Sequence, residues 1–157
     1  MSTLIRIYQP ADLEAIRALT VSAFDGVTLE QNVEQALGEL NGHDWQWRKA
    51  RHVDEDARLS SAGIFVAEQD GKVVGYISTL IDREAGKGRI PNLAVAAELR
   101  GQGLGRTLIE HVLQYFREQG LAYAMIETMA QNAIGHHLYT SCGFVEVARQ
   151  VHFARRL

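Results

Sequence analysis

The sequence predicts one α/β domain built on a mixed sheet, in which an antiparallel meander is followed by a β-α-β-α-β arrangement. Two strand-like runs meet at Asp70-Gly71, a dipeptide typical of hairpin turns. A glycine-rich junction at 101–105 links a third strand to an amphipathic helix at 104–119. The chain then adds a strand at 122–129 and a helix at 132–142. Strands that alternate with helices after a meander indicate a sheet with both pairing directions.

The composition fits a single globular domain over residues 1–157. The chain is 46% hydrophobic, which supplies a core for one domain of this length. Its net charge of −3 is opposite to that of a nucleic-acid-binding surface. No basic-then-apolar signal begins the chain, and no apolar run nears the roughly 20 residues of a membrane span. Cys142 is the only cysteine, which indicates a reducing compartment. From these observations together we expect a soluble, cytoplasmic protein with no nucleic-acid or membrane partner.

The first sixty residues predict a strand followed by helices. Residues 4–8 alternate between apolar and polar side chains and predict a strand, which a helix follows. Thr28 begins a second helix, with Gln31 placed for a capping box. Residues 41–62 have no clear period, so we expect only a short helix near 44–52.

The later elements have clearer limits. Residues 63–82 hold the two hairpin strands, and a third strand is expected over 89–95. The helix at 104–119 ends before Gly120, where a C-cap belongs. Residues 144–157 are strand-like and contain no turn residue, which predicts one long strand. Our hypothesis is that its free edge is covered by the same strand of a second subunit in a homodimer.

Three alternating glycines stand where the helix begins. Gly101, Gly103 and Gly105 lie between Arg100 and Arg106. Glycine tolerates positive φ and leaves the backbone N–H groups unshielded. The first N–H groups of a helix have no partner within it, and the helix dipole adds positive potential, so an anion such as phosphate is favoured there. The alternative is a glycine-rich turn with no ligand. The two flanking arginines make this alternative less favoured, because they add positive charge beside the loop.

A dinucleotide is one candidate for the phosphate ligand. Its fingerprint is G-x-G-x-x-G directly after a strand, with an acidic residue about 20 positions later, and Glu127 is roughly placed for that. This chain instead has G-x-G-x-G, with Arg106 at the place of the last glycine and hairpins before the loop. A G-x-x-x-x-G-K-[ST] phosphate loop is also absent from the sequence. A nicotinamide-dinucleotide protein is therefore the weakest of the functional hypotheses.

Two motifs resemble those of the GCN5-related N-acetyltransferase family. Residues 100–105, RGQGLG, match its R/Q-x-x-G-x-G/A motif. Residues 132–144, NAIGHHLYTSCGF, resemble N-x-x-A-x-x-L-Y-x-x-x-G-F. The two motifs in this order are more specific than either alone, and the resemblance covers essentially the whole chain. Gly135 replaces the family's usual alanine, a departure expected to lower helix stability slightly.

The resemblance implies an acetyl-CoA-dependent N-acetyltransferase that transfers acetyl directly to a primary amine and releases CoA. It places the pyrophosphate of acetyl-CoA on the glycine loop and the pantetheine arm along the preceding strand, where a splay from the strand at 122–129 admits it. Asn132 would contact the pantetheine or simply cap its helix. The implied cofactor-binding residues are Leu93, Ala94, Val95, Arg100, Gly101, Gln102, Gly103, Leu104, Gly105, Arg106 and Asn132.

The resemblance also suggests roles in proton transfer. Tyr139 occupies the tyrosine of the second motif and would protonate the leaving thiolate, the alternative being a packing role. Glu127 has the spacing of the base in a family branch that acetylates protein N-termini, and a structural hydrogen-bond acceptor is its alternative. Cys142 is expected to be a small buried hydrophobe rather than a nucleophile. His136 and His137 point to different helix faces, and no metal site is expected.

The acceptor is less well defined by the sequence. By resemblance, residues 24–29 shape the acceptor cleft, and Asp25 and Glu30 could attract a cationic amine. A protein N-terminus, a lysine side chain and a small-molecule amine stay open as acceptors. A non-catalytic acyl-CoA-binding or sensor module on the same fold is the second functional hypothesis.

Overall fold

The computed structural model describes residues 2–157, and Met1, at the start of the domain expected over 1–157, lies outside the described residues. Among residues 2–157, no helix is long and apolar enough to span a bilayer. The helices are α1 (Leu13–Ala23), α2 (Leu29–Leu37), α3 (Trp45–Ser60), α4 (Leu104–Glu118) and α5 (Ala133–Ser141), with short 3₁₀ turns at Pro10–Asp12, Ser61–Gly63 and Ala97–Leu99. The strands are β1 (Leu4–Ile7), β2 (Phe65–Gln69), β3 (Lys72–Ile77), β4 (Leu80–Asp82), β5 (Lys87–Ile90), β6 (Leu93–Val95) and β7 (Tyr123–Ile126).

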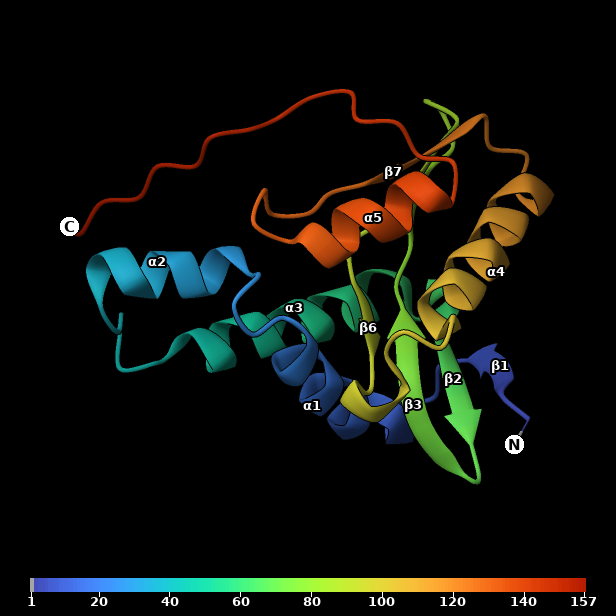
Figure 1. The fold of residues 1–157 in the computed structure, drawn as a ribbon, viewed down its shortest axis with the longest axis horizontal. Helices are drawn as coiled ribbons and strands as arrows, with labels where there is room; N and C mark the ends of the chain where they lie inside the picture. Colours follow the sequence, from blue (N-terminus) through green and yellow to red (C-terminus); the bar gives the residue numbers. More distant parts are fainter. Residues whose placement is uncertain (1) are drawn as a thin grey trace.

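The sheet is divided into two parts; Figure 1 labels β1, β2, β3 and β6 of the first part and β7 of the second. Strands β1, β2, β3 and β6 pair in that order, all antiparallel. Strands β4, β5 and β7 form the second part, in which β5 pairs antiparallel with β4 and parallel with β7. The mixed sheet and the Asp70-Gly71 hairpin are therefore confirmed. The single strand expected over 89–95 is instead two strands, because Pro91 has no N–H group with which to continue the ladder.

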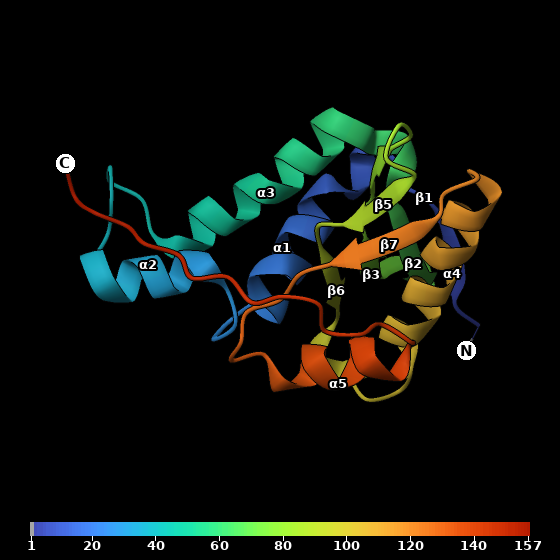
Figure 2. The same cartoon turned by 90° about the horizontal axis from the view of Figure 1, so that it is seen from above.

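Helices cover both faces of the antiparallel part (Figure 2). Phe65 and Ala67 of β2 pack with the buried face of α4. Val66, between them, points to the opposite face and packs with residues of α1 and α3. This alternation along β2 follows from the two-residue period of a strand. The two hydrophobic clusters hold β6 and the start of α4 in fixed positions.

Two helices near the N-terminus differ from the sequence prediction. The expected capping box at α2 is not formed, because the side chain of Thr28 caps no N–H group and Gln31 bonds to Asp25 and the N–H group of Gly26. Helix α3 is longer than the helix expected over 44–52 and runs to Ser60. Its buried face carries charged as well as apolar side chains, which conceals the helical period in the sequence; they are Trp45, Lys49, Val53 and Asp56.

The strand expected over 144–157 is not formed among the described residues. This C-terminal segment extends away from α5 and reaches α2 (Figures 1 and 2). Its far end is fastened by Arg156, which donates to the carbonyl oxygens of Leu37 at 2.9 Å and Glu39 at 3.0 Å. No strand of residues 2–157 pairs with the segment, and a strand exists only where a neighbour supplies hydrogen-bond partners. The strand expected over 122–129 is likewise shortened to β7.

Gly88 is required by the packing of β5 against α4. A Cβ atom built there would lie 2.6 Å from the ring of Phe116, which is buried in the core. We expect Gly88→Ala to lower the free energy of unfolding by about 1–3 kcal/mol through overpacking, measured by denaturant unfolding. In the double variant with Phe116→Leu, the two losses should be less than additive because the ring that clashes has gone. Strictly additive losses would show that the contact is not the cause.

Candidate active site

The three glycines of the loop meet two different structural demands. Gly101 and Gly103 have φ of +75° and +87°, a region that other residues rarely adopt. Gly105, in the first turn of α4, lies against α5, where a Cβ atom would come within 3.2 Å of Leu138 Cδ2. Two glycines therefore shape the turn, and the third lets α5 approach α4 closely.

The loop presents a row of free donors at the start of α4. Within residues 2–157, the backbone N–H groups of 101–106 donate to no acceptor. Helix α4 has 15 residues, and its dipole adds positive potential at this end. The guanidinium of Arg106 donates to Ser141 Oγ at 2.7 Å, and that of Arg100 donates to the carbonyl oxygen of Val95 at 3.3 Å. Neither arginine forms an ion pair within the described residues, so both add positive charge beside the loop.

A splay in the sheet opens beside this loop. Strands β5 and β7 are paired as far as Ile90 and Ile126, and beyond that point β6 pairs with β3 alone. Strand β6 is therefore an edge strand, and residues 93–95 offer backbone donors and acceptors on the side that β3 does not use. An extended ligand with amide groups can pair with such an edge as another strand would. The splay expected between this strand and the strand after α4 is confirmed.

Asn132 caps α5. Its Oδ1 accepts from the N–H group of Gly135 at 3.1 Å, and its Nδ2 donates to Thr128 Oγ1 at 2.8 Å. A Cβ atom on Gly135 would lie 2.6 Å from Asn132 Nδ2. The glycine that departs from the family motif therefore makes room for the Asn132 cap. The hydrogen bonds of this cap offset the loss of helix stability expected from the glycine.

Tyr139 lies on α5 with its ring 6.4 Å from that of Phe144, in an edge-to-face arrangement. Its hydroxyl forms no hydrogen bond within residues 2–157 and is therefore free to donate. Burial raises the pKa of the Tyr139 phenol to about 12. The hydroxyl is consequently protonated at neutral pH, as a proton donor must be.

Glu127 follows β7 directly and is engaged by Arg89 of β5. The guanidinium donates to both carboxylate oxygens, at 2.9 Å and 3.1 Å. These hydrogen bonds lower the pKa of the Glu127 carboxyl. The carboxylate side chain is 61% exposed, so it can be reached from solvent. While the pair is closed, Glu127 is a weak proton acceptor, which favours its structural alternative in this conformation.

A buried polar cluster, which the sequence interpretation missed, lies where β5 and β6 separate. The ammonium of Lys49 donates to Asn92 Oδ1 at 2.9 Å, and Asn92 Nδ2 donates to Asp56 Oδ2 at 2.6 Å. Lys49 also lies 4.0 Å from the ring centroid of Phe24. Burial lowers the pKa of Lys49 to about 8 and raises the pKa of Asp56. The seven-residue spacing of Lys49 and Asp56 on one helix face was the available signal.

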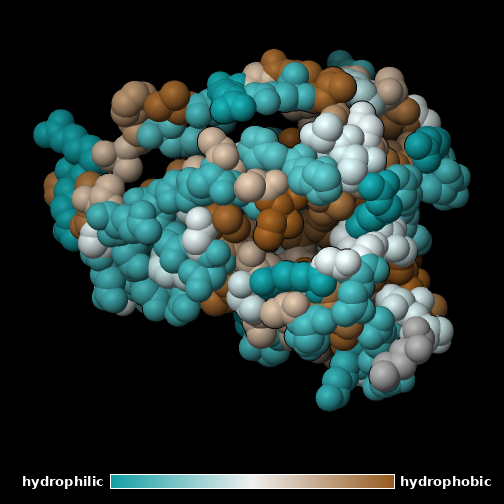
Figure 3. Space-filling model, viewed as in Figure 1, coloured by the Kyte–Doolittle hydropathy of each residue, from teal (hydrophilic) through white to brown (hydrophobic). Residues whose placement is uncertain are grey.

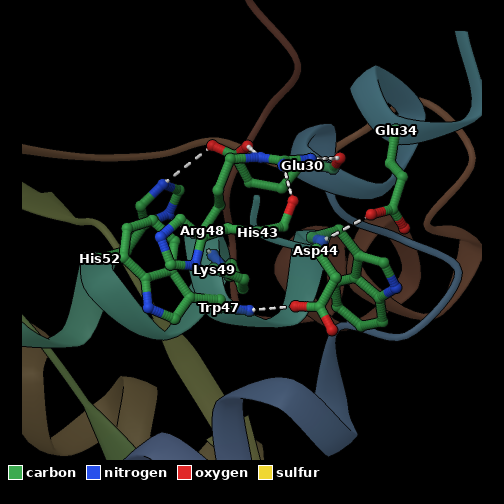
Figure 4. A network of polar contacts seen from close by, with 9 residues as sticks. Glu30, Glu34, His43, Asp44, Trp47, Arg48, Lys49 and His52 are labelled. Carbon is green, nitrogen blue, oxygen red and sulfur yellow. Dashed lines mark hydrogen bonds and ion pairs between the residues drawn. The ribbon is translucent and has the colours of Figure 1, made fainter. Parts of the chain in front are cut away.

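The acidic residues expected to attract an amine are already engaged. Glu30 pairs with Arg48 at 2.9 Å and with His52 at 3.2 Å (Figure 4). Asp25 accepts from Gln31 at 2.9 Å. His52, the partner of Glu30, also lines a cavity of about 230 Å³, whose other lining residues are Lys49, Glu55, Asp56, Arg89, Pro91 and Asn92. Charges of both signs line this cavity, so it is suited to a polar ligand.

The remaining candidates do not form a further reactive group. Cys142 is half-buried and packs against the core cluster that contains α4. Nε2 of His136 is buried, with no hydrogen-bond partner in the described part of the chain. Among residues 2–157, no three His, Cys, Asp or Glu side chains are placed to hold a metal ion.

Comparison with known proteins identifies the family. Residues 29–144 match the Acetyltransferase (GNAT) family, and the chain belongs to it. Mycothiol acetyltransferase of Tsukamurella paurometabola is 31% identical over 96% of this chain and 51% of its own length. The chain thus spans about half the length of that curated relative.

Two solved structures share the fold. The ribosomal-protein-S18-alanine N-acetyltransferase from Escherichia coli has a TM-score of 0.68 at 23% identity, over 94% of this chain and 80% of that one. PaiA N-acetyltransferase from Thermoplasma acidophilum, in complex with coenzyme A, has a TM-score of 0.71 at 20% identity, over 90% and 88% of the two chains. The expected fold is confirmed by both.

The ion pair of Arg89 and Glu127 can be tested by titration. In Arg89→Gln the main cause of the lowered pKa is removed while the partial desolvation of the carboxyl remains, so the Glu127 carboxyl should protonate at a higher pH than in the wild type. The measurement is the pH dependence of the side-chain carboxyl carbon shift by NMR. Arg83→Gln, which removes an exposed guanidinium bonded to Gln119, is the control and should leave that titration unchanged. An unchanged titration in Arg89→Gln would contradict the assigned cause.

Proposed function

We propose that this chain is an acetyl-CoA-dependent N-acetyltransferase that transfers acetyl directly to a primary amine and releases CoA. The observation that carries the proposal is the row of free N–H groups at 101–106 beside an open strand edge at 93–95. A pyrophosphate suits the first, because a helix N-terminus supplies donors and positive potential. An amide-bearing pantetheine arm suits the second.

The residues that would hold acetyl-CoA follow from this geometry. The loop N–H groups would bind phosphate oxygens, with the two flanking guanidiniums adding charge. The edge of β6 would pair with the pantetheine. The residues proposed for cofactor binding are Leu93, Ala94, Val95, Arg100, Gly101, Gln102, Gly103, Leu104, Gly105, Arg106 and Asn132. For Asn132 the proposed role is indirect, since its side chain holds the turn into α5.

Acetyl-CoA supplies an activated thioester, and residues of the chain would donate and accept the protons that the transfer requires. Tyr139 is the proposed acid for the leaving thiolate, because its phenol is protonated and makes no competing hydrogen bond within residues 2–157. Glu127 is the proposed base only when Arg89 releases its carboxylate, because the closed pair holds the carboxyl pKa low. Cys142 takes no part, and the amine attacks the thioester without an acyl-enzyme.

The acceptor is proposed to be an amine-bearing molecule bound on the α2–α3 side of the splay. The polar cavity that includes Lys49, Asp56 and Arg89 lies at the end of β5. The names of the similar proteins concern different amines, and a protein N-terminus, a lysine and a small amine all stay in the proposal. We further propose that the protein is cytoplasmic, which the single cysteine supports, and has no nucleic-acid partner, which the net charge of −3 supports. We also propose a homodimer, because the extended segment 144–157 pairs with no strand of residues 2–157.

Binding of acetyl-CoA can be tested by thermal unfolding. A ligand at 100 times its dissociation constant should stabilise the fold by about 2.7 kcal/mol, so acetyl-CoA and CoA should raise the melting temperature and NAD should not. Gly103→Ala should weaken this response, because alanine rarely adopts the φ of +87° found there, so the loop that carries the free N–H groups would have to change its conformation. Gly120→Ala is a matched control, since Gly120 also has positive φ and open space but lies after α4. Stabilisation by neither CoA species would refute the proposed ligand.

Tyr139→Phe should lower the turnover number by about 10² to 10⁴ with little change in acetyl-CoA affinity, since only the proton donor is removed. The measurement is CoA thiol release with three amines in turn: a peptide N-terminus, a lysine peptide and a small polyamine. Tyr123→Phe, at an exposed site on β7, is the control and should retain wild-type turnover. Equal turnover in Tyr139→Phe would exclude the acid role, whereas CoA binding without release for any amine would favour the acyl-CoA-binding module.

A further inference from the structure

The guanidinium of Arg89 has hydrogen-bond donors that its ion pair with Glu127 does not use. A guanidinium carries several N–H groups in a planar fork and can bind a carboxylate along more than one edge. Glu127 accepts from Nε at 2.9 Å and from Nη2 at 3.1 Å. Within residues 2–157, Nη1 donates to no acceptor. The side chain is 40% exposed and lines the polar cavity, so the edge that includes Nη1 is available to a ligand.

The two acidic side chains that line the same cavity already have partners in the chain. Asp56 accepts from Asn92 Nδ2 at 2.6 Å, and Asn92 in turn accepts from the ammonium of Lys49 at 2.9 Å. Glu55 lies 3.9 Å from Arg58, measured from Oε1 to Nη2. The acids of the cavity therefore do not occupy the free edge of the Arg89 guanidinium.

The charges of the cavity lining favour a ligand that carries both signs. The lining is cationic at Arg89 and Lys49 and anionic at Glu55 and Asp56. A ligand binds best where its own charges are complementary to those of the site. An amine acceptor brings the positive charge. Full complementarity requires that the same molecule also bring a negative charge to the guanidinium.

The size and surroundings of the cavity favour a small acceptor. Its volume of about 230 Å³ is below the roughly 300–1,000 Å³ of pockets that hold drug-sized ligands. Helix α2 borders the cavity, because Glu30 of α2 lies 3.2 Å from His52 in the lining. The surface over α2, at the left of Figure 3, is predominantly hydrophilic. Both features suit a small charged molecule better than a large or an apolar one.

We propose that the acceptor is a small amine that also carries a carboxylate, as an amino acid does, and that the free edge of Arg89 binds this carboxylate beside Glu127. The inference rests on the proposed acetyl transfer, whose acceptor class it narrows. One guanidinium then holds the carboxylate of Glu127 and that of the ligand, so a short chain must join the amine of the ligand to its carboxylate. A lysine side chain of a protein has no carboxylate at such a fixed distance from its amine and is not favoured.

Binding of the ligand carboxylate would also change Glu127. Two carboxylates that share one guanidinium repel each other, and this repulsion favours the protonated form of each. Hydrogen bonds from Arg89 lower the pKa of the Glu127 carboxyl in the free protein. That pKa should therefore rise when a carboxylate ligand binds, which makes Glu127 a stronger proton acceptor in the complex than in the free protein.

Titration of Glu127 by NMR tests binding without relying on catalysis. The probes are L-alanine, L-leucine, β-alanine and 4-aminobutyrate, each compared with its own amide, in the presence of CoA, which carries no acetyl group. At least one of the acids, and none of the amides, should raise the pH at which the side-chain carboxyl carbon of Glu127 titrates. Arg89→Gln should remove this difference, and the exposed control Arg83→Gln should retain it. Equal shifts with acid and amide, or no shift with any acid, would overturn the proposal.

Release of CoA from acetyl-CoA tests the same preference in turnover. For the best acid, kcat/KM should exceed that of its amide by about tenfold or more, as expected for hydrogen bonds between charged groups. An acid and its amide differ in the basicity of the amine, and this difference cancels when the ratio in the wild type is compared with the ratio in a variant. The ratio should fall about tenfold in Arg89→Gln and stay unchanged in Arg83→Gln. An unchanged ratio in Arg89→Gln would contradict carboxylate binding by Arg89.

The failure of this inference is distinguishable from the failure of the proposed function. CoA release with amines and amides but without preference for the acids would leave acetyl transfer in place and refute the carboxylate site. A shift of the Glu127 titration by the acids, without CoA release for any amine, would support the carboxylate site and refute acetyl transfer.

Discussion

The separation of β5 from β6 at Pro91 and Asn92 is the constraint on which the rest of the site depends. Before it, β5 is paired with β7; after it, β6 pairs with β3 alone and its other edge is free. Two hydrogen bonds with Ser78 compensate for the strand pairing that is lost at this point. The N–H group of Ser78 donates to the Asn92 carbonyl oxygen at 2.9 Å, and the N–H group of Asn92 donates to Ser78 Oγ at 3.0 Å. A sheet that continued straight through this point would close the gap and leave no edge for a ligand.

The buried cluster of Lys49, Asn92 and Asp56 links that separation to helix α3. An isolated buried charge is costly, so each of these groups must be satisfied by the others. Asn92 donates to the carboxylate and accepts from the ammonium, and it thereby links two opposite charges through one amide. The same amide is fixed to the strand ends. Helix α3 is therefore bound to the splay by polar contacts and to the sheet by Val53, which is fully buried. Breaking either partner of Asn92 would leave the other charge buried without compensation.

The parts of the structure that follow from local pattern could be predicted from the sequence, and those that follow from distant contacts could not. The hairpin at Asp70-Gly71, helix α4 and the positive φ of Gly101 and Gly103 each depend on a few neighbouring residues. Helix α3 was underestimated because its buried face carries charges whose partner, Asn92, is 36 residues beyond Asp56. The pair of Arg89 and Glu127, 38 residues apart, depends on parallel pairing of β5 with β7. The C-terminal segment has the sequence pattern of a strand, but it forms none among residues 2–157, because no neighbouring strand pairs with it and a sequence pattern does not show whether such a neighbour is present.

Tyr139 and Glu127 are tuned in opposite directions by different means. Burial without a charged partner raises the pKa of the phenol, and hydrogen bonds from a guanidinium lower the pKa of the carboxyl. At neutral pH the phenol is protonated and the carboxyl is ionised, as an acid and a base must be. Acetyl transfer needs both, because the amine starts as an ammonium that must lose a proton and the CoA leaves as a thiolate that must gain one. Holding the carboxylate ionised also weakens it as a proton acceptor. Because Arg89 lies beside the polar cavity, an acceptor that draws its guanidinium away would raise the basicity of Glu127 only once the acceptor is bound. In the proposed mechanism, the ion pair would therefore couple occupation of the cavity to the removal of the proton.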